Sequence, residues 1–384
     1  MDILHEIVVA LQAEANVMLA TILSTDGSTP ASALSKMLVR EKGKNWIGTV
    51  GGGCVEGDVL EASIQLFGKG TAKTLTFELN ETNVDQGLIC GGTLDVLIEP
   101  LNMRDLELFR QLKAARDEGE DSVLATFIAK GGIVGGKYCV QVKGEWNSGI
   151  VEQWNDGMMQ WWKNLAGNPD NSSTSEIVAI AEAVGKAHRR NETQLLALPG
   201  GELILEPVKG MPSLIIFGGG HVSKYVSRAA AMTGFRVTIV DDRPEYANAG
   251  RFPEADNTLA LDFTEALGRI EIKPSTYIVI VTRGHRSDEE ILSRVVDSPA
   301  KYIGMIGSKR KVLTTYEHLV QSGVSAELLK RIHAPIGIEI GAATAEEIGI
   351  SVAAQLIAVR RGEAERQENK SDAMQKLITQ ITQI

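Results

Sequence analysis

The chain of 384 residues has few cysteines, no long apolar run and no excess of positive charge. Its three cysteines (Cys54, Cys90 and Cys139) are widely spaced, and none belongs to a Cys-x-x-Cys pair. This spacing excludes a disulfide scaffold and disfavours a structural zinc site. No apolar run approaches the roughly 18 residues that a membrane-spanning helix needs, and the first residues are acidic where a secretory signal would be basic. We therefore expect a cytoplasmic protein with no membrane partner.

The charge balance disfavours nucleic acid as a partner. Lysine and arginine number 39 against 49 acidic residues, which gives a formal net charge of −10. Affinity for nucleic acid comes mostly from neutralised phosphates, so an acidic protein is poorly suited to it. Hydrophobic residues at 43% and charged residues at 23% are typical of a globular protein. Because the length exceeds that of a usual single core, we expect two domains.

The N-terminal part, residues 1–207, is predicted to be a mixed α/β domain in which residues 101–200 form a helix and strand extension. Apolar spacing predicts helices over residues 3–14 and 102–118. Strands are predicted at residues 17–23, 37–39, 46–50, 94–100, 122–129 and 137–143. The segment around Trp154, Trp161 and Trp162 is expected to be a partly buried helix. Leu203-Ile204-Leu205-Glu206-Pro207 echoes Leu97-Ile98-Glu99-Pro100, an echo that we interpret as two strands that end alike.

Residues 212–360 show a pattern typical of a Rossmann-like doubly wound parallel sheet. An apolar strand at 213–217 leads into Gly218, Gly219, Gly220 and His221 and then a helix, and a second strand at 236–240 ends at Asp241 and Asp242. The glycines allow a pyrophosphate to approach the positive end of the helix, and an acidic residue about twenty positions on can accept hydrogen bonds from a ribose. This predicts NAD or another adenine nucleotide as a ligand, although Ser223 replaces the third glycine. We expect Gly218→Val to block the ligand and leave the fold nearly intact.

Further βα units place polar loops after their strands. One loop contains Arg283 and His285, and another contains Ser308 and Lys309. Ser308 and Lys309 could hold a phosphate at a helix start, or could be an N-cap serine beside a solvated lysine; both alternatives stay open. A capping box at residues 344–347 predicts a helix over 345–360. Residues 361–384 are predicted to be a charged tail.

Two glycine-flanked cysteines mark the first domain. Gly51, Gly52, Gly53, Cys54 and Glu56 lie between a predicted strand and a predicted helix, and a second run reads Cys90-Gly91-Gly92. Such a loop can bind an anion, and a helix start lowers the pKa of a thiol. Cys54 and Cys90 are thus candidate ligands for a thiophilic metal or for a metal–dithiolene centre. The alternative is that both are small buried residues and that Glu56 itself satisfies the helix dipole. Cys139 is expected to lie in the core.

Several motifs occur together and in one order along nearly the whole chain. The N-terminal ones are Gly51-Gly52-Gly53-Cys54-Val55-Glu56, Cys90-Gly91-Gly92 and Ile98-Glu99-Pro100. The C-terminal ones are the stretch 217–242, Thr282-Arg283-Gly284-His285, Tyr302-Ile303-Gly304-Met305-Ile306-Gly307-Ser308 and the stretch 334–342. This combination resembles the XdhC/CoxI family of accessory proteins for xanthine dehydrogenase and related molybdenum hydroxylases. One departure is Pro30-Ala31-Ser32, where that family often has a basic residue after the proline.

The resemblance implies a maturation factor. Such a protein binds molybdenum cofactor (molybdopterin), protects it while a terminal sulfido ligand is installed, and assists its insertion into an apo hydroxylase. The implied partners are the apo molybdenum hydroxylase and a cysteine desulfurase, and the implied state is a homodimer.

Two alternatives remain beside the resemblance. The first is an NAD(H)-dependent oxidoreductase that uses Asp241 on the ribose and His221 or His285 in acid–base chemistry. The second is an interaction protein with a vestigial nucleotide fold. No catalytic set with a nucleophile, a base and an orienting group can be named in the sequence. This favours a cofactor chaperone without turnover of its own.

Overall fold

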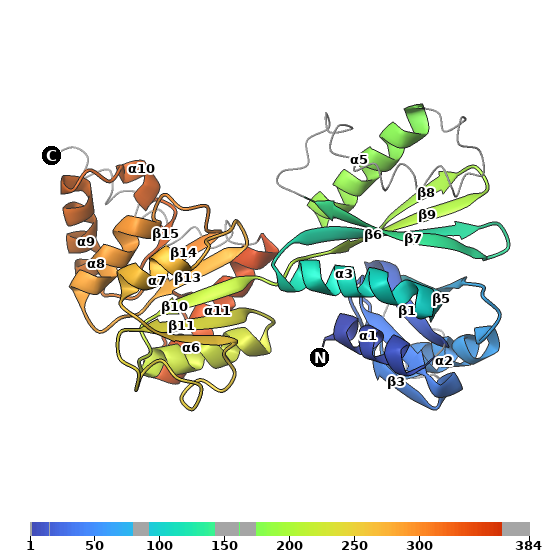
Figure 1. Cartoon of the computed structure of the whole chain (residues 1–384), viewed down its shortest axis with the longest axis horizontal. Coiled ribbons are helices and arrows are strands. Elements are labelled where there is room, and N and C mark those ends of the chain that lie inside the picture. The colour runs from blue at the N-terminus through green and yellow to red at the C-terminus, as the bar shows by residue number, and fades with distance from the viewer. Residues whose placement is uncertain (1, 15, 80–91, 143–160, 162–173, 363–384) are drawn as a thin grey trace. The chain divides into compact units, whose positions relative to one another are not determined.

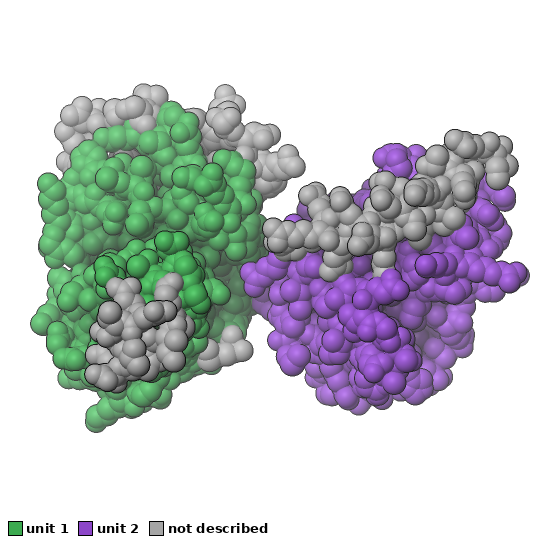
Figure 2. All heavy atoms as spheres, turned by 180° about the vertical axis from the view of Figure 1, so that it is seen from behind, with its two compact units in different colours: residues 1–210 green, residues 211–384 purple. Residues whose placement is uncertain are grey.

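The computed structural model describes residues 2–14, 16–79, 92–142, 161 and 174–362. The chain divides into two compact units, residues 1–210 and 211–384, which we call unit 1 and unit 2 (Figure 2). No helix in the described ranges is both long and apolar enough to cross a membrane. Each unit has its own sheets and its own apolar core.

Unit 1 contains two antiparallel sheets rather than one mixed sheet (Figure 1). The first sheet has the order β3-β2-β1-β5-β4, and the second has the order β7-β6-β9-β8. The strands of the first are β1 (Asn16–Gly27), β2 (Lys36–Arg40), β3 (Asn45–Gly48), β4 (Lys73–Leu79) and β5 (Gly92–Asn102). The strands of the second are β6 (Asp121–Ala129), β7 (Val134–Val142), β8 (Gln194–Leu198) and β9 (Gly201–Val208). The helices are α1 (Ile3–Ala13), α2 (Cys54–Leu66), α3 (Leu106–Asp117) and α5 (Thr174–Arg190).

The two sheets of unit 1 belong to an internal repeat. The order α1-β1-β2-α2-β4-β5 recurs as α3-β6-β7-α5-β8-β9, and the sheet order β2-β1-β5-β4 recurs as β7-β6-β9-β8. We call residues 3–102 repeat 1 and residues 106–208 repeat 2. Strand β3 is an addition to repeat 1. The segment 101–200, which the sequence predicts to be an extension, therefore supplies most of repeat 2.

The strand registers match residue by residue. In repeat 1, Thr21 lies opposite Lys36 and Leu19 lies opposite Glu99. In repeat 2, Thr126 lies opposite Lys137 and Leu124 lies opposite Glu206. The two glutamates are those of the Ile98-Glu99-Pro100 and Leu205-Glu206-Pro207 runs. The echo between these runs therefore marks equivalent positions of an internal repeat, and not only a likeness of two strand ends.

The helices that open the two repeats pack against each other. Helix α1 buries Ile7 and Leu11, and α3 buries Phe109 and Leu112 in one apolar cluster that both repeats share. Arg116 at the end of α3 also donates to the Asp2 carboxylate at the start of α1. Each fully buried large side chain contributes about 1.5–3 kcal/mol. The repeats are thus joined through a common core.

Unit 2 is the predicted Rossmann-like domain. Its six strands are parallel and have the order β12-β11-β10-β13-β14-β15 (Figure 1). The strands are β10 (Ser213–Phe217), β11 (Arg236–Asp241), β12 (Asn257–Ala260), β13 (Thr276–Ile280), β14 (Tyr302–Met305) and β15 (Ile332–His333). The helices are α6 (His221–Met232), α7 (Phe263–Arg269), α8 (His285–Val295), α9 (Lys309–Gln321), α10 (Ala326–Leu329) and α11 (Ala345–Arg361). Helices α6 and α11 cover one face of the sheet, while α8 and α9 cover the other.

Local signals explain where the elements begin and end. The predicted helix 102–118 begins later, at Leu106, because Asn102 caps a short 3-10 turn over Met103–Asp105. The capping box of Thr344 and Glu347 starts α11 as predicted, and Gly362 ends it in the left-handed conformation. Of the expected tryptophan helix, Trp161 alone lies within the described residues, in contact with Tyr138.

Candidate functional site

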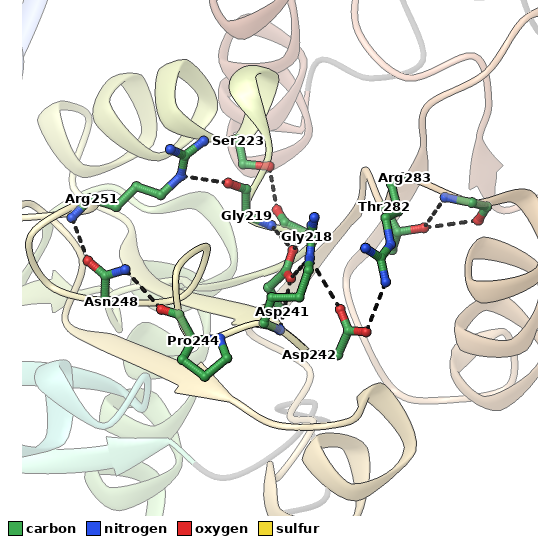
Figure 3. Close-up of polar contacts among 12 residues, drawn as sticks. Gly218, Gly219, Ser223, Asp241, Asp242, Pro244, Asn248, Arg251, Thr282 and Arg283 are labelled. Carbon is green, nitrogen blue, oxygen red and sulfur yellow. Dashed lines mark hydrogen bonds and ion pairs between the residues drawn. The ribbon is translucent and has the colours of Figure 1, made fainter.

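The candidate site of unit 2 lies at the carboxyl edge of its parallel sheet. From β10 the chain builds outward through β11 and β12, and it then returns to β13 on the other side of β10. Ligands of open parallel sheets bind at such a switch point, outside the ends of the strands. The glycine loop after β10 and the loop of residues 282–284 after β13 flank this point (Figure 3).

The first two glycines of the loop are needed by the protein's own backbone. Gly218 has a φ of +102°, and a Cβ there would lie 2.6 Å from the carbonyl oxygen of Val281. A Cβ on Gly219 would collide with the carbonyl of Tyr246. Gly220 differs, because its φ is −70° and the space around its Cβ position is open. The expectation that Gly218→Val leaves the fold nearly intact is therefore wrong, and Gly220 is the position open to a ligand.

Asp241 lies at the end of β11 but faces the inside of the protein. Its side chain is 2% exposed. Its carboxylate accepts hydrogen bonds from the Gly219 amide at 2.8 Å and from Nε and Nη2 of Arg243 at 2.8 and 3.0 Å (Figure 3). Burial opposes ionisation of this carboxyl, but the bonds from Arg243 and Gly219 outweigh it and lower the pKa of Asp241. The carboxylate is thus ionised and already used by its neighbours.

Asp242 is the exposed member of the acidic pair. Its side chain is 40% exposed, and it pairs with Arg283 at 3.3 Å, which links the loops after β11 and β13 across the switch point (Figure 3). The guanidinium of Arg243 lies over the Tyr246 ring at 3.6 Å, and Arg251 donates from Nε to the Gly219 carbonyl at 2.9 Å. The structure therefore brings several predicted residues together, and adds arginines that the sequence analysis missed.

Two helices begin at this edge without a side-chain cap. Helix α6 starts at His221 after Gly220, and α8 starts at His285 after Gly284; neither glycine can cap the helix. Both histidines are exposed. By contrast, Ser308 accepts a hydrogen bond from the Lys311 amide at 3.3 Å, which is the N-cap alternative for that residue. Lys309 is exposed at the same edge. Uncapped amides favour a bound anion.

A buried polar network that the sequence did not predict lies behind the carboxyl edge of the sheet. Asp288 of α8 is fully buried, and it accepts a 2.6 Å hydrogen bond from the Thr282 hydroxyl and an ion pair from Lys311 of α9. The network fixes the loop after β13 to both helices. A helical spacing from residue 284 could have placed Asp288 in the first turn, but it could not show which lysine reaches it.

The candidate site of unit 1 is the glycine–cysteine loop before α2. Gly51, Gly52 and Gly53 have φ values of +131°, +74° and +55°. A Cβ on Gly51 would lie 2.9 Å from the Pro30 side chain, whereas the space at Gly52 and Gly53 is open. Such consecutive left-handed residues require glycine. Gly52 and Gly53 are exposed, so the backbone of the loop is accessible from solvent at these two residues.

The loop ends at the first residue of a helix. Cys54 opens α2 behind Gly53, which supplies no side-chain cap, and the Cys54 side chain is half-buried. The Glu56 carboxylate accepts a hydrogen bond from Thr49, whose hydroxyl accepts the Gly51 amide at 3.2 Å. Glu56 therefore helps to hold the loop in place through Thr49. Cys90 lies outside the described residues, and those residues contain no cluster of three or more histidine, cysteine or acidic side chains that could hold a metal ion.

Models of one protein family match both units. The model described as the XdhC and CoxI family matches residues 10–78, and the model described as the XdhC Rossmann domain matches residues 214–356. The first falls on repeat 1 and contains the glycine–cysteine loop. The second spans the sheet of unit 2 from β10 into α11 and contains the switch-point loops.

Three curated proteins are similar in sequence. YqeB of Escherichia coli strain K12, described as uncharacterized, is 34% identical over 163 residues, which cover 42% of this chain and 30% of YqeB. A Bacillus subtilis strain 168 protein described as a probable xanthine dehydrogenase subunit is 26% identical over 91% of this chain and 95% of its own length. The molybdenum cofactor insertion chaperone PaoD of E. coli strain K12 is 21% identical over 93% of this chain and 88% of its own.

The fold is also found in a solved structure. The crystal structure of a xanthine dehydrogenase from Bacillus halodurans matches with a TM-score of 0.69 and 22% identity, covering 97% of this chain and 99% of the other. At that identity the match concerns the fold. With both family models matched in order, and relatives aligned over nearly the whole length, this chain belongs to the XdhC and CoxI family.

Proposed function

We propose that this protein is a maturation factor that binds molybdenum cofactor, assists its sulfuration and inserts it into a xanthine dehydrogenase-type hydroxylase. The observation that carries the proposal is the similarity to a molybdenum cofactor insertion chaperone over 93% of this chain and 88% of the relative. Similarity on that scale includes both units, so it is not confined to a common nucleotide-binding fold. The cofactor is the cargo of such a protein.

The glycine–cysteine loop fits this cargo chemically. Molybdopterin carries a phosphate and a molybdenum–dithiolene centre. Open backbone at Gly52 and Gly53, followed by an uncapped helix start, suits the phosphate. Cys54 at that helix start supplies a soft sulfur donor beside it, and we propose Cys90 as a second donor. The Glu56 carboxylate accepts a hydrogen bond from Thr49, so its role is to hold the loop rather than to contact the anion.

The edge of unit 2 is proposed as a second anion site. Gly220, His221, Arg283, His285, Ser308 and Lys309 line the loops at the carboxyl ends of β10, β13 and β14. Two uncapped helix starts and several cations lie there in a protein whose net charge is −10. This supports a phosphate-bearing ligand, for which NAD or another adenine nucleotide is the candidate.

The oxidoreductase alternative receives less support from the same edge. A dinucleotide bound through its ribose diol needs a free acidic oxygen at the end of β11. Both oxygens of Asp241 accept internal hydrogen bonds, and its charge is matched by Arg243. The exposed Asp242 would have to leave Arg283 to take that role. Calorimetric titration with NAD and NADP, followed by an assay for hydride transfer, distinguishes a turnover enzyme from a carrier.

The proposed partners follow from the cargo. An apo molybdenum hydroxylase receives the cofactor, and a cysteine desulfurase supplies sulfur while the cofactor is held. We propose that the chain acts as a homodimer, which light scattering of the purified protein tests directly.

The deciding experiment is cofactor retention. The protein is purified from a molybdenum-replete host, and bound pterin is quantified by mass spectrometry for the wild type, Cys54→Ser and Cys90→Ser. Serine keeps the size of cysteine but is a harder donor, so we expect strong loss of pterin without loss of folding. Cys139→Ser is the matched control, because Cys139 lies on β7 and burial raises the pKa of its thiol.

Two results would contradict the proposal. Wild-type protein that carries no pterin, and that does not activate an apo hydroxylase supplied with molybdopterin, would remove the chaperone function. Cys54→Ser and Cys90→Ser proteins that retain pterin like the wild type would leave the function standing and remove the cysteines from the site.

A further inference from the structure

A cluster of four charged side chains is buried between the two repeats of unit 1. Lys36 of β2 pairs with Glu206 of β9, and Lys137 of β7 pairs with Glu99 of β5. The glutamates are 1% and 0% exposed, and the lysines are 13% and 2% exposed. Each ion pair joins a lysine of one repeat to a glutamate of the other. The pairs are therefore reciprocal across the repeat.

The repeat makes the two pairs equivalent in position. Lys36 and Lys137 both lie opposite a buried threonine, Thr21 and Thr126, and both glutamates precede the proline of the echoed run. Lys36 also donates to the Thr21 hydroxyl at 2.9 Å. If all four groups simply formed ion pairs, the two halves of the cluster should respond alike to the same substitution.

The cluster leaves buried oxygens unsatisfied. Within the described residues, Oε1 of Glu99, Oε1 of Glu206 and Oγ1 of Thr126 are buried without a hydrogen-bond partner. An ionised carboxylate only accepts hydrogen bonds, so two such oxygens cannot satisfy each other. A buried polar atom without a partner costs about 1–3 kcal/mol. The charge of Glu206 acts on Glu99, so the two carboxyls are neighbours. One proton shared between them would satisfy both oxygens.

We propose that this cluster is a proton-binding site, in which Glu99 is protonated on Oε1 and donates to Oε1 of Glu206. The proton comes from solvent water. One O–H bond forms on Glu99 and no bond between heavy atoms breaks. The formal charge of the four groups rises from zero to +1. Oε2 of Glu99 continues to accept from Lys137, and Glu206 continues to pair with Lys36.

The electrostatics of the surrounding elements agree with this assignment. Burial raises the pKa of Glu99 above its ordinary value, and the charge of Glu206 acts in the same direction. Lys137 and Lys36 oppose that rise. These three groups come from β9, β7 and β2, and the two lysines lie opposite Thr21 of β1 and Thr126 of β6. Glu99 and its partner Lys137 are 0% and 2% exposed, whereas Lys36 beside Glu206 is 13% exposed. The Glu99 pair is therefore the more deeply buried one, and the proton is assigned to Glu99.

The proton links stability to pH in a defined direction. A carboxyl whose pKa is raised by folding holds a proton that the unfolded chain has already released. Folding then takes up a proton between the ordinary pKa and the raised one. The free energy of unfolding of unit 1 should therefore rise as the pH falls through that window.

The test compares Glu99→Gln with Glu206→Gln in the full-length chain. All five tryptophans precede residue 163, so tryptophan fluorescence during urea denaturation reports on unit 1. A glutamine at position 99 is neutral, like the protonated acid, and its amide can donate to Glu206. We expect the urea midpoint of Glu99→Gln to stay near that of the wild type. The free energy of unfolding of this variant should not rise as the pH falls. Glu206→Gln should lower the folding equilibrium constant by about tenfold or more, because it leaves Lys36 without a charged partner.

Infrared difference spectra keep the proposal falsifiable if Glu206→Gln does not fold. At about pH 6, well above the ordinary glutamate pKa of ~4.3, the wild type minus Glu99→Gln spectrum should contain a protonated-carboxyl band. Absence of that band would overturn the proposal. Equal destabilisation by the two glutamine variants would also overturn it, since that is the response of two equivalent ion pairs.

Discussion

The amide of Gly219 donates a 2.8 Å hydrogen bond to the carboxylate of Asp241. This contact joins the loop after β10 to the end of β11. Arg243 donates a second hydrogen bond to the same carboxylate. The acidic residue that would usually contact a ribose is thus part of the scaffold of the loop. Its role in this protein is to fix the glycine loop in place.

Asp241→Asn should consequently destabilise unit 2. Asparagine keeps an oxygen for the Gly219 amide but loses the charge that pairs with Arg243, at a cost of about 1–3 kcal/mol. Asp242→Asn is the matched control and should stay within about 0.5 kcal/mol, because that side chain is 40% exposed. Hydrogen–deuterium exchange of unit 2 peptides measures both effects. Equal protection in the two variants would remove Asp241 from the scaffold.

Gly218→Ala and Gly220→Ala separate folding from ligand approach. At Gly218 a Cβ meets the Val281 carbonyl in a left-handed backbone, which costs about 1–3 kcal/mol. At Gly220 the added methyl group enters open space, so the fold should remain. If a phosphate approaches this loop, Gly220→Ala lowers affinity for it while the thermal midpoint stays constant. Calorimetry and thermal unfolding on the same samples give both readouts.

Lys311→Met should be far more costly than Lys309→Met. Lys311 is the ion-pair partner of the fully buried Asp288, and breaking such a pair costs about 3 kcal/mol. Lys309 lies two residues earlier on the same helix and is exposed. Chemical denaturation followed by circular dichroism should show a lower midpoint for the first variant alone. A normal midpoint for Lys311→Met would mean that Thr282 suffices to hold Asp288.

His333 should make unit 2 less stable in mild acid. The ring stacks on Tyr302 at 4.6 Å, and burial lowers the pKa of His333 from 6.5 to about 4. Between these values the unfolded chain binds a proton that the folded protein excludes, so stability falls as the pH drops, by up to about 3 kcal/mol. His333→Phe keeps the stacked ring and should lose this part of the pH dependence. Parallel pH curves for the two proteins would contradict the assignment.

The sequence predicts the fold of unit 2 well because its signals are local. Apolar runs mark buried parallel strands, and the Thr344 capping box sets the start of α11. The glycine motif also predicts the turn after β10. It cannot show that Gly218 and Gly219 face Val281 and Tyr246 rather than a ligand, because those contacts join residues far apart in the chain. For the same reason Asp241 and Asp242 look equivalent in sequence and differ in the structure.

The sequence shows the repeat of unit 1 only as two similar short runs, Leu97–Pro100 and Leu203–Pro207. A short apolar run with a glutamate before a proline suggests only similar strand ends. The equivalence of Lys36 with Lys137 becomes evident only from strand register, since each lysine lies opposite a threonine. The cluster also joins residues up to 170 positions apart, as Lys36 and Glu206 show. No periodicity within a strand could have predicted that pairing.

The reciprocal pairing between the repeats has an evolutionary consequence. A duplicated module would first have carried its lysine and its glutamate as one heritable set, identical in both copies. In the folded chain, however, Lys36 depends on Glu206 and Lys137 depends on Glu99. Across homologous sequences, substitutions should therefore covary between the two copies rather than within either one. A lineage that loses the charge at one lysine should also change the glutamate that pairs with it in the other copy. The two copies should therefore change together.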